Sequence, residues 1–503
     1  MAPQLLDRPL VYLSISSILG LLLLSLVYLR FLAWYRLRHI DGPWLASLSY
    51  LWLLWATFKE GQGISFMKLD QKYGSLVRIG PKDLITSDPE IIQRMNGARS
   101  KYQRSSWYKR TRVDPYYASL FSMMDTAEHT KIRARMSSGY RAKENSTIEG
   151  VDEQLVEFVA LIRRKYLSSD HELRSLDLAG KITFFALDVL SKVAYGRAFG
   201  YLRTDSDVHG HVESMETAVN SLSVLLDIPW LTGLLFSKTF LGLFGPTPTD
   251  KNGRGKMMGI AQAVTSEERF GSDAKDRQDI IGSFIKHGFT RRQCETEIPF
   301  QIVAGSGTVA TAICGTMLSL LSLPRVYFKL REDIDGAIAR GQISSPIKED
   351  EAMKLEYLQA VIYEGLRINT PLSSLLSKEV PPEGDTIDGK FIPGGTRIGH
   401  NNLAIHRSTT VFGCDAHVFR PERWLDIDAE KHRRMTQTVE LIFGYGQFGC
   451  LGKNIAFMEL NKVYVELLRY FDFQLIDPKK PMHSVDRNIF LQKDMWVRVT
   501  ERA

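Results

Sequence analysis

One cysteine stands in a stretch of glycines near the C-terminal end of the chain. Residues 443–452 read FGYGQFGCLG, so Cys450 is accompanied by four glycines. Apolar residues at three-to-four spacing follow from Ala456, which predicts a helix that starts just after the thiol. A helix N-terminus favours a thiolate, and glycines let a flat ligand approach the backbone. The pattern indicates a thiolate ligand for a metal, with an ordinary buried cysteine as the alternative.

Charged and hydroxyl residues occur upstream of this loop. Glu364 and Arg367 share one face of a predicted helix, and Arg423 follows in the sequence PERW. On a protein surface, a pair of this kind contributes little to stability. Thr308 lies within a long apolar helix that ends near Pro324. Its hydroxyl could hold a water and pass on protons, or it could bond to the backbone one turn earlier.

The composition argues against several other kinds of protein. The 503 residues include four cysteines, at positions 294, 314, 414 and 450, without a CxxC pair. This argues against a zinc ribbon and against a disulfide-stapled secreted fold. The net charge of +7 is small and spread along the chain, so it does not indicate a nucleic-acid partner. A mild basic excess suits an acidic protein partner or an anionic membrane surface.

The N-terminal residues have the composition of a membrane anchor. Leu10–Leu29 contains no charged residue and is long enough to cross a bilayer as a helix, although a buried core helix is the alternative. Arginines follow at positions 30, 36 and 38, and the positive-inside rule then places the body of the protein in the cytosol. We expect an anchor and proline hinge over residues 1–41, with its helix at about 10–29. We expect residues 42–503 to form one catalytic domain, because no linker divides them.

Periodicity along this domain predicts a mainly α-helical fold with small β-sheets. Apolar residues at positions 355, 358, 362 and 366 predict one helix, and those from Ala456 to Tyr470 predict another. Short alternating runs at Leu76–Ile79 and Trp496–Val499 predict strands. Residues 386–396 have the glycine turns of a β-hairpin.

Three motifs occur in a characteristic order. They are Glu364-x-x-Arg367, the PERW of residues 421–424, and Phe443-x-x-Gly446-x-x-x-Cys450-x-Gly452. In this order and spacing they resemble the heme-thiolate cytochrome P-450 monooxygenases, and residues 128–133, EHTKIR, resemble that family's early heme-contacting helix. The likeness covers nearly the whole chain and is greatest to fungal microsomal members of the pisatin-demethylase type. It implies the P-450 fold, preceded by one transmembrane helix.

The resemblance implies heme b as the cofactor, with Cys450 as the axial ligand of its iron. His129 and Arg133 would reach the heme propionates, and Thr308 would lie over the iron on the distal side. Two further groups of residues are implied. The buried triad behind the heme would be Glu364, Arg367 and Arg423. The cysteine loop would bind the heme through Phe443, Gly446 and Gly452.

At Gly307 the chain departs from the family pattern. The family often has an acid just before the distal threonine, and here no carboxylate occurs between Ala304 and Ala312. Protons for Thr308 would then come from water, the substrate or a more distant group. Alternatively, the enzyme does not run an ordinary hydroxylation cycle.

Phe448 is a second departure from the family pattern. The family usually has an arginine two residues before the cysteine, and that arginine contacts a propionate. Here one propionate contact is lost. We expect His129, Arg133 or His406 to replace it. Neither departure changes the predicted iron ligand.

The resemblance also implies partners and a location. Electrons would come from an NADPH-cytochrome reductase, a flavoprotein that would dock near Lys453, Arg433 and Arg434. The chain would cross the endoplasmic reticulum membrane once, with its catalytic domain in the cytosol. The substrate would be a lipophilic small molecule, as a family-level expectation an intermediate of fungal secondary metabolism. Its pocket would draw on residues 105–124, 214–258, 303–308 and 372–376.

Three other functions remain open. Gly305–Ala310 fits G-x-G-x-x-A, the fingerprint of an NAD-dependent dehydrogenase, but residues 320–331 lack the acid that should follow about 20 residues on. A heme-thiolate isomerase or dehydratase would need no O2, and Gly307 is compatible with that chemistry. A heme-binding protein without catalytic activity is the third, and Thr308 argues against it.

Overall fold

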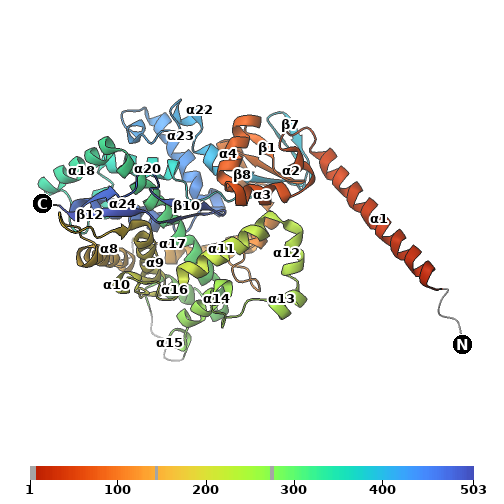
Figure 1. Cartoon of the computed structure of the whole chain (residues 1–503), viewed down its shortest axis with the longest axis horizontal. Coiled ribbons are helices and arrows are strands. Elements are labelled where there is room, and N and C mark those ends of the chain that lie inside the picture. The colour runs from red at the N-terminus through yellow and green to blue at the C-terminus, as the bar shows by residue number, and fades with distance from the viewer. Residues whose placement is uncertain (1–6, 142–144, 272–276, 503) are drawn as a thin grey trace.

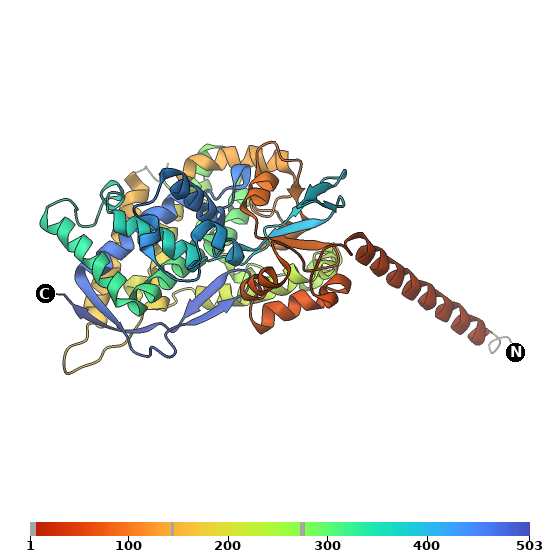
Figure 2. The same ribbon diagram turned by 90° about the horizontal axis from the view of Figure 1, so that it is seen from above.

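The computed structural model describes residues 7–141, 145–271 and 277–502, and consists of a mostly helical body with one projecting helix (Figure 1). That helix, α1 (Asp7–Arg36), points away from the body in both views (Figures 1 and 2). Its segment Ser17–Arg36 has a mean hydropathy of 1.9, and none of it is buried. This segment is therefore a candidate membrane span, and it contains most of the anchor helix predicted at about residues 10–29.

A buried arginine of the body binds the end of α1. Arg78 ends strand β1 (Leu76–Arg78) and donates hydrogen bonds to the carbonyls of Ala33 and Trp34, at 2.9 and 3.2 Å. These carbonyls lie in the last turn of α1, where no intrahelical donor is available. Arg78 thereby joins the end of the projecting helix to the first sheet.

The first sheet has five strands in the order β1-β2-β8-β5-β3. Strands β2 and β8 are parallel and the other pairs are antiparallel. The remaining bounds are β2 (Asp83–Thr86), β3 (Gln103–Arg104), β5 (Lys378–Glu379) and β8 (Arg397–His400). Figure 1 shows this sheet beside the first helices of the body, α2 (Trp44–Leu48), α3 (Leu51–Lys59) and α4 (Gln62–Tyr73).

Three short β units complete the strand content. The predicted hairpin forms between β6 (Asp385–Ile387) and β7 (Lys390–Ile392), with both turn residues at positive φ. A three-stranded sheet has the order β4-β12-β9, and β10 pairs with β11. The bounds are β4 (Leu176–Asp177), β9 (Phe471–Leu475), β10 (His483–Asp486), β11 (Phe490–Lys493) and β12 (Trp496–Glu501). The predicted strands at 76–79 and 496–499 are confirmed.

A long central helix, α17 (Arg291–Ser322), organises the helical part. A capping box of Thr290 and Gln293 starts it, and most of its side chains are buried. Its neighbours are α9 (Leu178–Tyr195), α14 (Gly253–Val264), α20 (Glu356–Ile368) and α24 (Lys453–Tyr470). The two helices predicted from periodicity correspond to α20 and α24.

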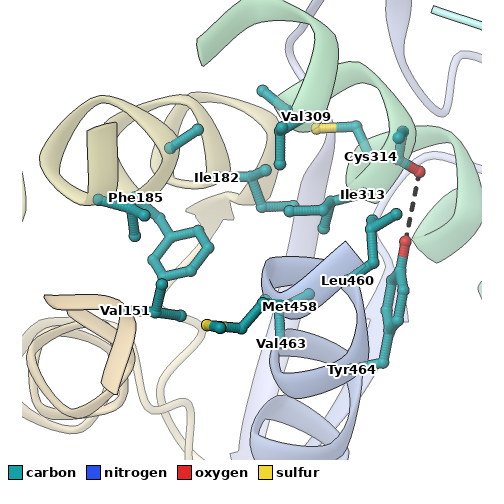
Figure 3. Packing of buried hydrophobic residues seen from close by; sticks show 14 of the residues in the cluster. Val151, Ile182, Phe185, Val309, Ile313, Cys314, Met458, Leu460, Val463 and Tyr464 are labelled. Atoms are coloured by element: carbon teal, nitrogen blue, oxygen red, sulfur yellow. Dashed lines mark hydrogen bonds between the residues drawn. The ribbon is translucent and has the colours of Figure 1, made fainter. Parts of the chain in front are cut away.

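The apolar core fixes α24 beneath α17. Figure 3 shows Val309 and Ile313 of α17 between Ile182 of α9 and the side chains of α24. Tyr464 of α24 donates a hydrogen bond to the carbonyl of Ala312 at 3.4 Å (Figure 3). Because Cys450 lies just before α24, this packing also sets the position of the cysteine loop.

The remaining helical segments complete the body. Before α17 they are α5 (Pro89–Asn96), α6 (Ser106–Arg110), α7 (Thr126–Met136), η1 (Ser137–Tyr140), α8 (Asn145–Lys165), α10 (Tyr201–Thr204), α11 (His211–Asp227), α12 (Pro229–Leu235), α13 (Lys238–Phe244), α15 (Glu267–Phe270) and α16 (Ile280–Lys286). After α17 they are α18 (Pro324–Ala339), α19 (Glu349–Ala352), α21 (Asn402–Ile405), α22 (Thr409–Phe412), η2 (Pro421–Trp424), α23 (Ala429–Glu440), η3 (Leu441–Phe443) and η4 (Gly446–Phe448).

The glycine motif at 305–310 lies in the middle of α17, with helix on both sides. A dinucleotide site requires a strand before this motif and a helix that begins at it. At Gly305 an added Cβ would come within 2.9 Å of Leu190 Cδ1, so this glycine permits close packing of α17 against α9. The dehydrogenase alternative is therefore wrong.

Candidate functional site

The cysteine loop is a tight turn that ends at α24. The amide of Cys450 donates to the carbonyl of Phe443 at 2.6 Å and closes the turn. Gly446 has φ +58°, and a Cβ there would come within 2.6 Å of the Asn96 carbonyl oxygen. A side chain at Gly446 would thus be both strained and obstructed by α5. Phe443 and Gly446 therefore shape the loop that presents the thiol.

The thiol of Cys450 faces a space inside the protein. Its side chain is exposed, yet burial is the largest influence on it and raises its pKa above the ordinary value. The amides of Gly452 and Lys453 donate to the sulfur, and the charges of Arg133 and Lys453 also oppose this rise. A Cβ on Gly452 would meet only the Cys450 sulfur, at 3.9 Å. This arrangement leaves room for a flat ligand against the sulfur.

Cations gather around Phe448, the residue that stands where the family pattern has an arginine. Lys378 Nζ lies 3.1 Å from the centre of the Phe448 ring, and the Arg104 guanidinium carbon lies 4.8 Å from it. The His129 ring is 5.1 Å away. Lys378 Nζ, Arg104 Nε and His129 Nδ1 are all buried without a hydrogen-bond partner in the described parts of the chain. Burial lowers the pKa of Lys378 to about 6 and that of His129 to about 3.

Arg104 and Lys378 were missed by the sequence reasoning. They are direct partners in the antiparallel pair of β3 and β5, so their side chains share one face of the sheet. Each strand has only two residues and no hydrophobic alternation that would predict it. The pairing comes from the tertiary fold, and neither residue carries a local signal for it.

The donors without acceptors are Lys378 Nζ, Arg104 Nε and His129 Nδ1. Together they form a site that is ready to bind carboxylates.

Helix α7 brings two of the predicted residues to the loop. His129 and Arg133 are one turn apart, and both face the cysteine loop. Burial lowers the pKa of Arg133, and the nearby Cys450 counteracts this. The carbonyl of His406 accepts a hydrogen bond from Arg367 at 2.8 Å, which places its backbone beside the triad. His406 is fully buried, which lowers its pKa to about 4, and its neighbours include Arg407 and the backbone of Thr438 and Val439.

The predicted triad forms a buried ion-pair network. Arg367 donates to both oxygens of Glu364, at 2.9 and 2.7 Å, and Arg423 donates to one of them at 2.9 Å. The indole of Trp424 binds the other oxygen at 3.0 Å. Both arginines also bind backbone carbonyls of residues 412–418. The network therefore connects α20 and η2 with the loop that precedes the cysteine region.

Two predicted residues of α17 lie side by side with different surroundings. Thr308 is half-buried, and its hydroxyl donates to the Ala304 carbonyl at 2.7 Å. Its lone pairs can still accept a hydrogen bond from a water or a ligand. Gly307 is buried, but a Cβ there would meet only Ile489 Cδ1, at 3.9 Å. A small side chain therefore fits at position 307.

Two of the basic residues near the loop are already in ion pairs. Lys453 Nζ lies 2.8 Å from Glu440 Oε2, and Arg433 lies 2.6 Å from Glu430 Oε1. Among the described residues, no group of three or more His, Cys, Asp or Glu side chains has the arrangement of a metal site.

The chain is similar to known proteins over most of its length. The sequence profile described as "Cytochrome P-450" matches residues 43–496. A relative named cytochrome P-450 monooxygenase ABA1, from Pyricularia oryzae, is 46% identical and aligns with 96% of this chain and 97% of its own length. The relative aba1 from Botryotinia fuckeliana is 44% identical over 92% of both chains. The monooxygenase abl1 from Leptosphaeria maculans is 38% identical over 93% of this chain and 84% of its own length.

Proposed function

Because this chain belongs to the cytochrome P-450 family, we propose that it inserts one oxygen atom from O2 into a lipophilic small molecule. As a member of this family, the chain is an oxidoreductase with heme iron as its cofactor. The observation that carries the proposal is the thiol of Cys450, which accepts two backbone amides and faces an open space. We assign Cys450 as the axial ligand of the iron.

The residues around this thiol fit a heme. One side supplies a sulfur with hydrogen-bond donors and nearby positive charge, which oppose the rise that burial causes in the pKa of the thiol. The other side supplies unpartnered donors from Lys378, Arg104 and His129, which suit the two propionate carboxylates. We propose that these three residues and Arg133 hold the propionates, and that Phe443, Gly446 and Gly452 shape the loop against the heme. The His406 carbonyl binds Arg367 of the triad, and we propose a supporting role for His406 there rather than a propionate contact.

The triad of Glu364, Arg367 and Arg423 has a structural role in this proposal. Its arginines bind the carbonyls of residues 412–418 and so fix the chain that leads to the cysteine loop. The network lies entirely within the protein, where the loss of one partner would leave an uncompensated charge.

The heme, when bound, supplies oxygen activation, because a thiolate ligand favours cleavage of the O–O bond. Thr308 is half-buried, and its hydroxyl already donates to the Ala304 carbonyl. The free lone pairs of this hydroxyl would accept a hydrogen bond from a water. Gly307 contributes space and no acid. The protein therefore orients the reactants and controls the path of protons.

We further propose that the chain is held in the endoplasmic reticulum membrane by α1 and that residues 42–503 form one cytosolic catalytic domain. Exposed apolar side chains on α12 and α13 support entry of a lipophilic substrate from the bilayer. They are Trp230, Leu234, Leu243 and Phe244, each more than half exposed. A membrane-bound NADPH-cytochrome reductase would supply the electrons. The fungal relatives are consistent with secondary metabolism as the setting.

One alternative keeps the heme and omits O2. Gly307 favours it, because the described part of α17 has no carboxylate next to Thr308. Membranes that contain this chain and its reductase distinguish the two reactions. NADPH-dependent O2 uptake that requires Cys450 supports the monooxygenase, whereas turnover that is independent of NADPH and O2 supports an isomerase or dehydratase.

A further inference from the structure

The proposed monooxygenase reaction requires protons. One turnover combines O2, the substrate, two electrons and two protons, and yields the hydroxylated product and water. The electrons come from NADPH through the flavoprotein reductase. The inference below rests on that proposed function and concerns the group that supplies the protons, because Gly307 cannot.

Helix α17 carries one deeply buried carboxyl group, that of Glu297. Its Oε1 accepts the amide of Leu120 at 2.7 Å. Burial raises the pKa of Glu297 to about 8, and the Leu120 amide opposes that rise. At neutral pH this group is therefore mostly protonated and can donate a proton.

A second buried polar residue follows one turn later. Gln301 donates from Nε2 to the Tyr140 hydroxyl at 2.7 Å, while its Oε1 is buried without a hydrogen-bond partner in the described residues. An unpaired buried carbonyl oxygen of this kind is costly, and a buried water is the usual way to satisfy it.

These residues lie on the same face of α17 as Thr308. At 100° per residue, Gln301 is rotated by about 40° from Glu297, and Thr308 by about 20°. The rise from Glu297 to Thr308 is about 16 Å, with Gln301 between them. Ala304, one turn before Thr308, lies on this face and is only partly buried. Its small side chain leaves space for water beside Thr308.

The same face borders the cysteine site. Tyr140 lies close enough to both Glu297 and Cys450 that either negative charge raises its pKa. Arg104 of the cation cluster donates to the carbonyl of Leu120, the residue whose amide binds Glu297. Glu297 thus lies at the junction of α17 with the walls of the site.

We propose that Glu297 is the proton source for oxygen activation and that Gln301 orients the water that carries its proton towards Thr308. The carboxylic acid gives its proton to this water, and the resulting carboxylate takes up another from bulk solvent. Glu297 is a proton-relay residue that acts through water. The ionisable groups that face it are Tyr140 and Cys294, and the pKa of each lies above its usual value.

A purely structural role for Glu297 makes a different prediction. If it only holds the loop at Leu120, any acceptor of the same shape will serve. Glu297→Gln retains a carbonyl oxygen for the Leu120 amide but cannot supply the proton. This substitution separates the two roles without the loss of the loop contact.

The experiment uses the full-length heme-loaded enzyme, reconstituted with reductase in vesicles, and no added substrate. Infrared spectra locate protonated carboxyl groups, and NADPH-dependent O2 uptake is measured from pH 6.5 to 9. Asp227→Asn is the matched control, because burial also raises the pKa of Asp227 to about 8, whereas its partners are Thr57 and Gln62, away from α17. Carbon monoxide spectra confirm equal heme loading.

We expect Glu297→Gln to lose a carboxyl band and to lower O2 uptake roughly 100-fold. In the unmodified enzyme, uptake should fall as pH rises through about 8, because the donor deprotonates, and Glu297→Gln should lack this step. Asp227→Asn should lose its own band and keep the pH step. Unchanged uptake and an unchanged pH step in Glu297→Gln would overturn the proposed role of Glu297 but would leave the proposed function intact. A folded, unmodified chain that lacks a thiolate-type carbon monoxide band would overturn the proposed function as well.

Discussion

Arg104 and Lys378 stand directly opposite each other on the antiparallel strands β3 and β5, and both lie over the ring of Phe448. Like charges in this position destabilise a sheet unless an anion lies between them. The arginine absent from position 448 is thus replaced in space by two cations from another part of the chain. In the proposed site, these two residues would hold the heme propionates in its place.

Lys378→Met should weaken heme binding. It removes one charged hydrogen bond to a propionate, which corresponds to roughly tenfold faster loss of heme. The measurement is the rate of heme transfer to excess apomyoglobin. Lys101→Met serves as the control, because Lys101 is exposed and pairs with Glu383 at the surface. Equal rates for the two variants would contradict the assignment.

Heme retention should also depend on pH through Lys378. Without a propionate, burial lowers the pKa of this lysine to about 6, and a bound carboxylate must raise it. The bound state therefore takes up a proton, so affinity should decrease as pH rises above about 6. Transfer rates at pH 6.5 and 8.5 should differ in the unmodified protein and differ less in Lys378→Met. A slope that is the same in both proteins would assign the titration to another group.

Phe448→Arg should be harmful on its own and tolerated in a double variant. A third cation beside Lys378 and Arg104 adds repulsion, at a cost of about 1–3 kcal/mol in stability. Phe448→Arg combined with Lys378→Met restores the number of charges and should recover most of the heme content. Holoprotein yield and chemical unfolding test this pair. If neither measure recovers in the double variant, an arginine at position 448 does not substitute for Lys378.

The triad predicts a large effect from a small substitution. Glu364→Gln leaves Arg367 buried without a counter-charge and leaves Arg423 with only Asp415, which should cost about 3–5 kcal/mol of stability. Glu430→Gln removes an exposed carboxylate that pairs with Arg433, and it should cost less than about 1 kcal/mol. Denaturant unfolding of both variants decides the point. Similar midpoints would mean that the triad does not fix the loop.

Two glycines of α17 offer a matched comparison. Gly307→Ala should stabilise the protein by up to about 1 kcal/mol, because alanine favours helix and its Cβ meets only Ile489 at 3.9 Å. Gly305→Ala forces Leu190 to move and should be less stable than Gly307→Ala by about 1 kcal/mol. Thermal unfolding provides the measurement. The opposite order would show that the packing of α9 on α17 differs from that described here.

Whether the sequence predicts a site residue depends on how far apart along the chain its contacts lie. The helix after Cys450 and the spacing of Glu364 and Arg367 are local patterns, so periodicity predicts them. Lys378 and Arg104 meet only through strand pairing, and two-residue strands carry no alternation that predicts them. The glycine motif at 305–310 is ambiguous in sequence, because glycine serves both phosphate loops and close helix contacts. Leu190 on the neighbouring helix resolves that ambiguity.

The most direct test of the central claim is the carbon monoxide difference spectrum of reduced membranes that contain the unmodified chain or its Cys450→Ala variant. The account predicts a thiolate-type band in the unmodified chain and its loss in the variant, with similar amounts of folded protein. A folded, unmodified chain without that band, or a variant that retains it, would contradict the assignment of Cys450 as the iron ligand.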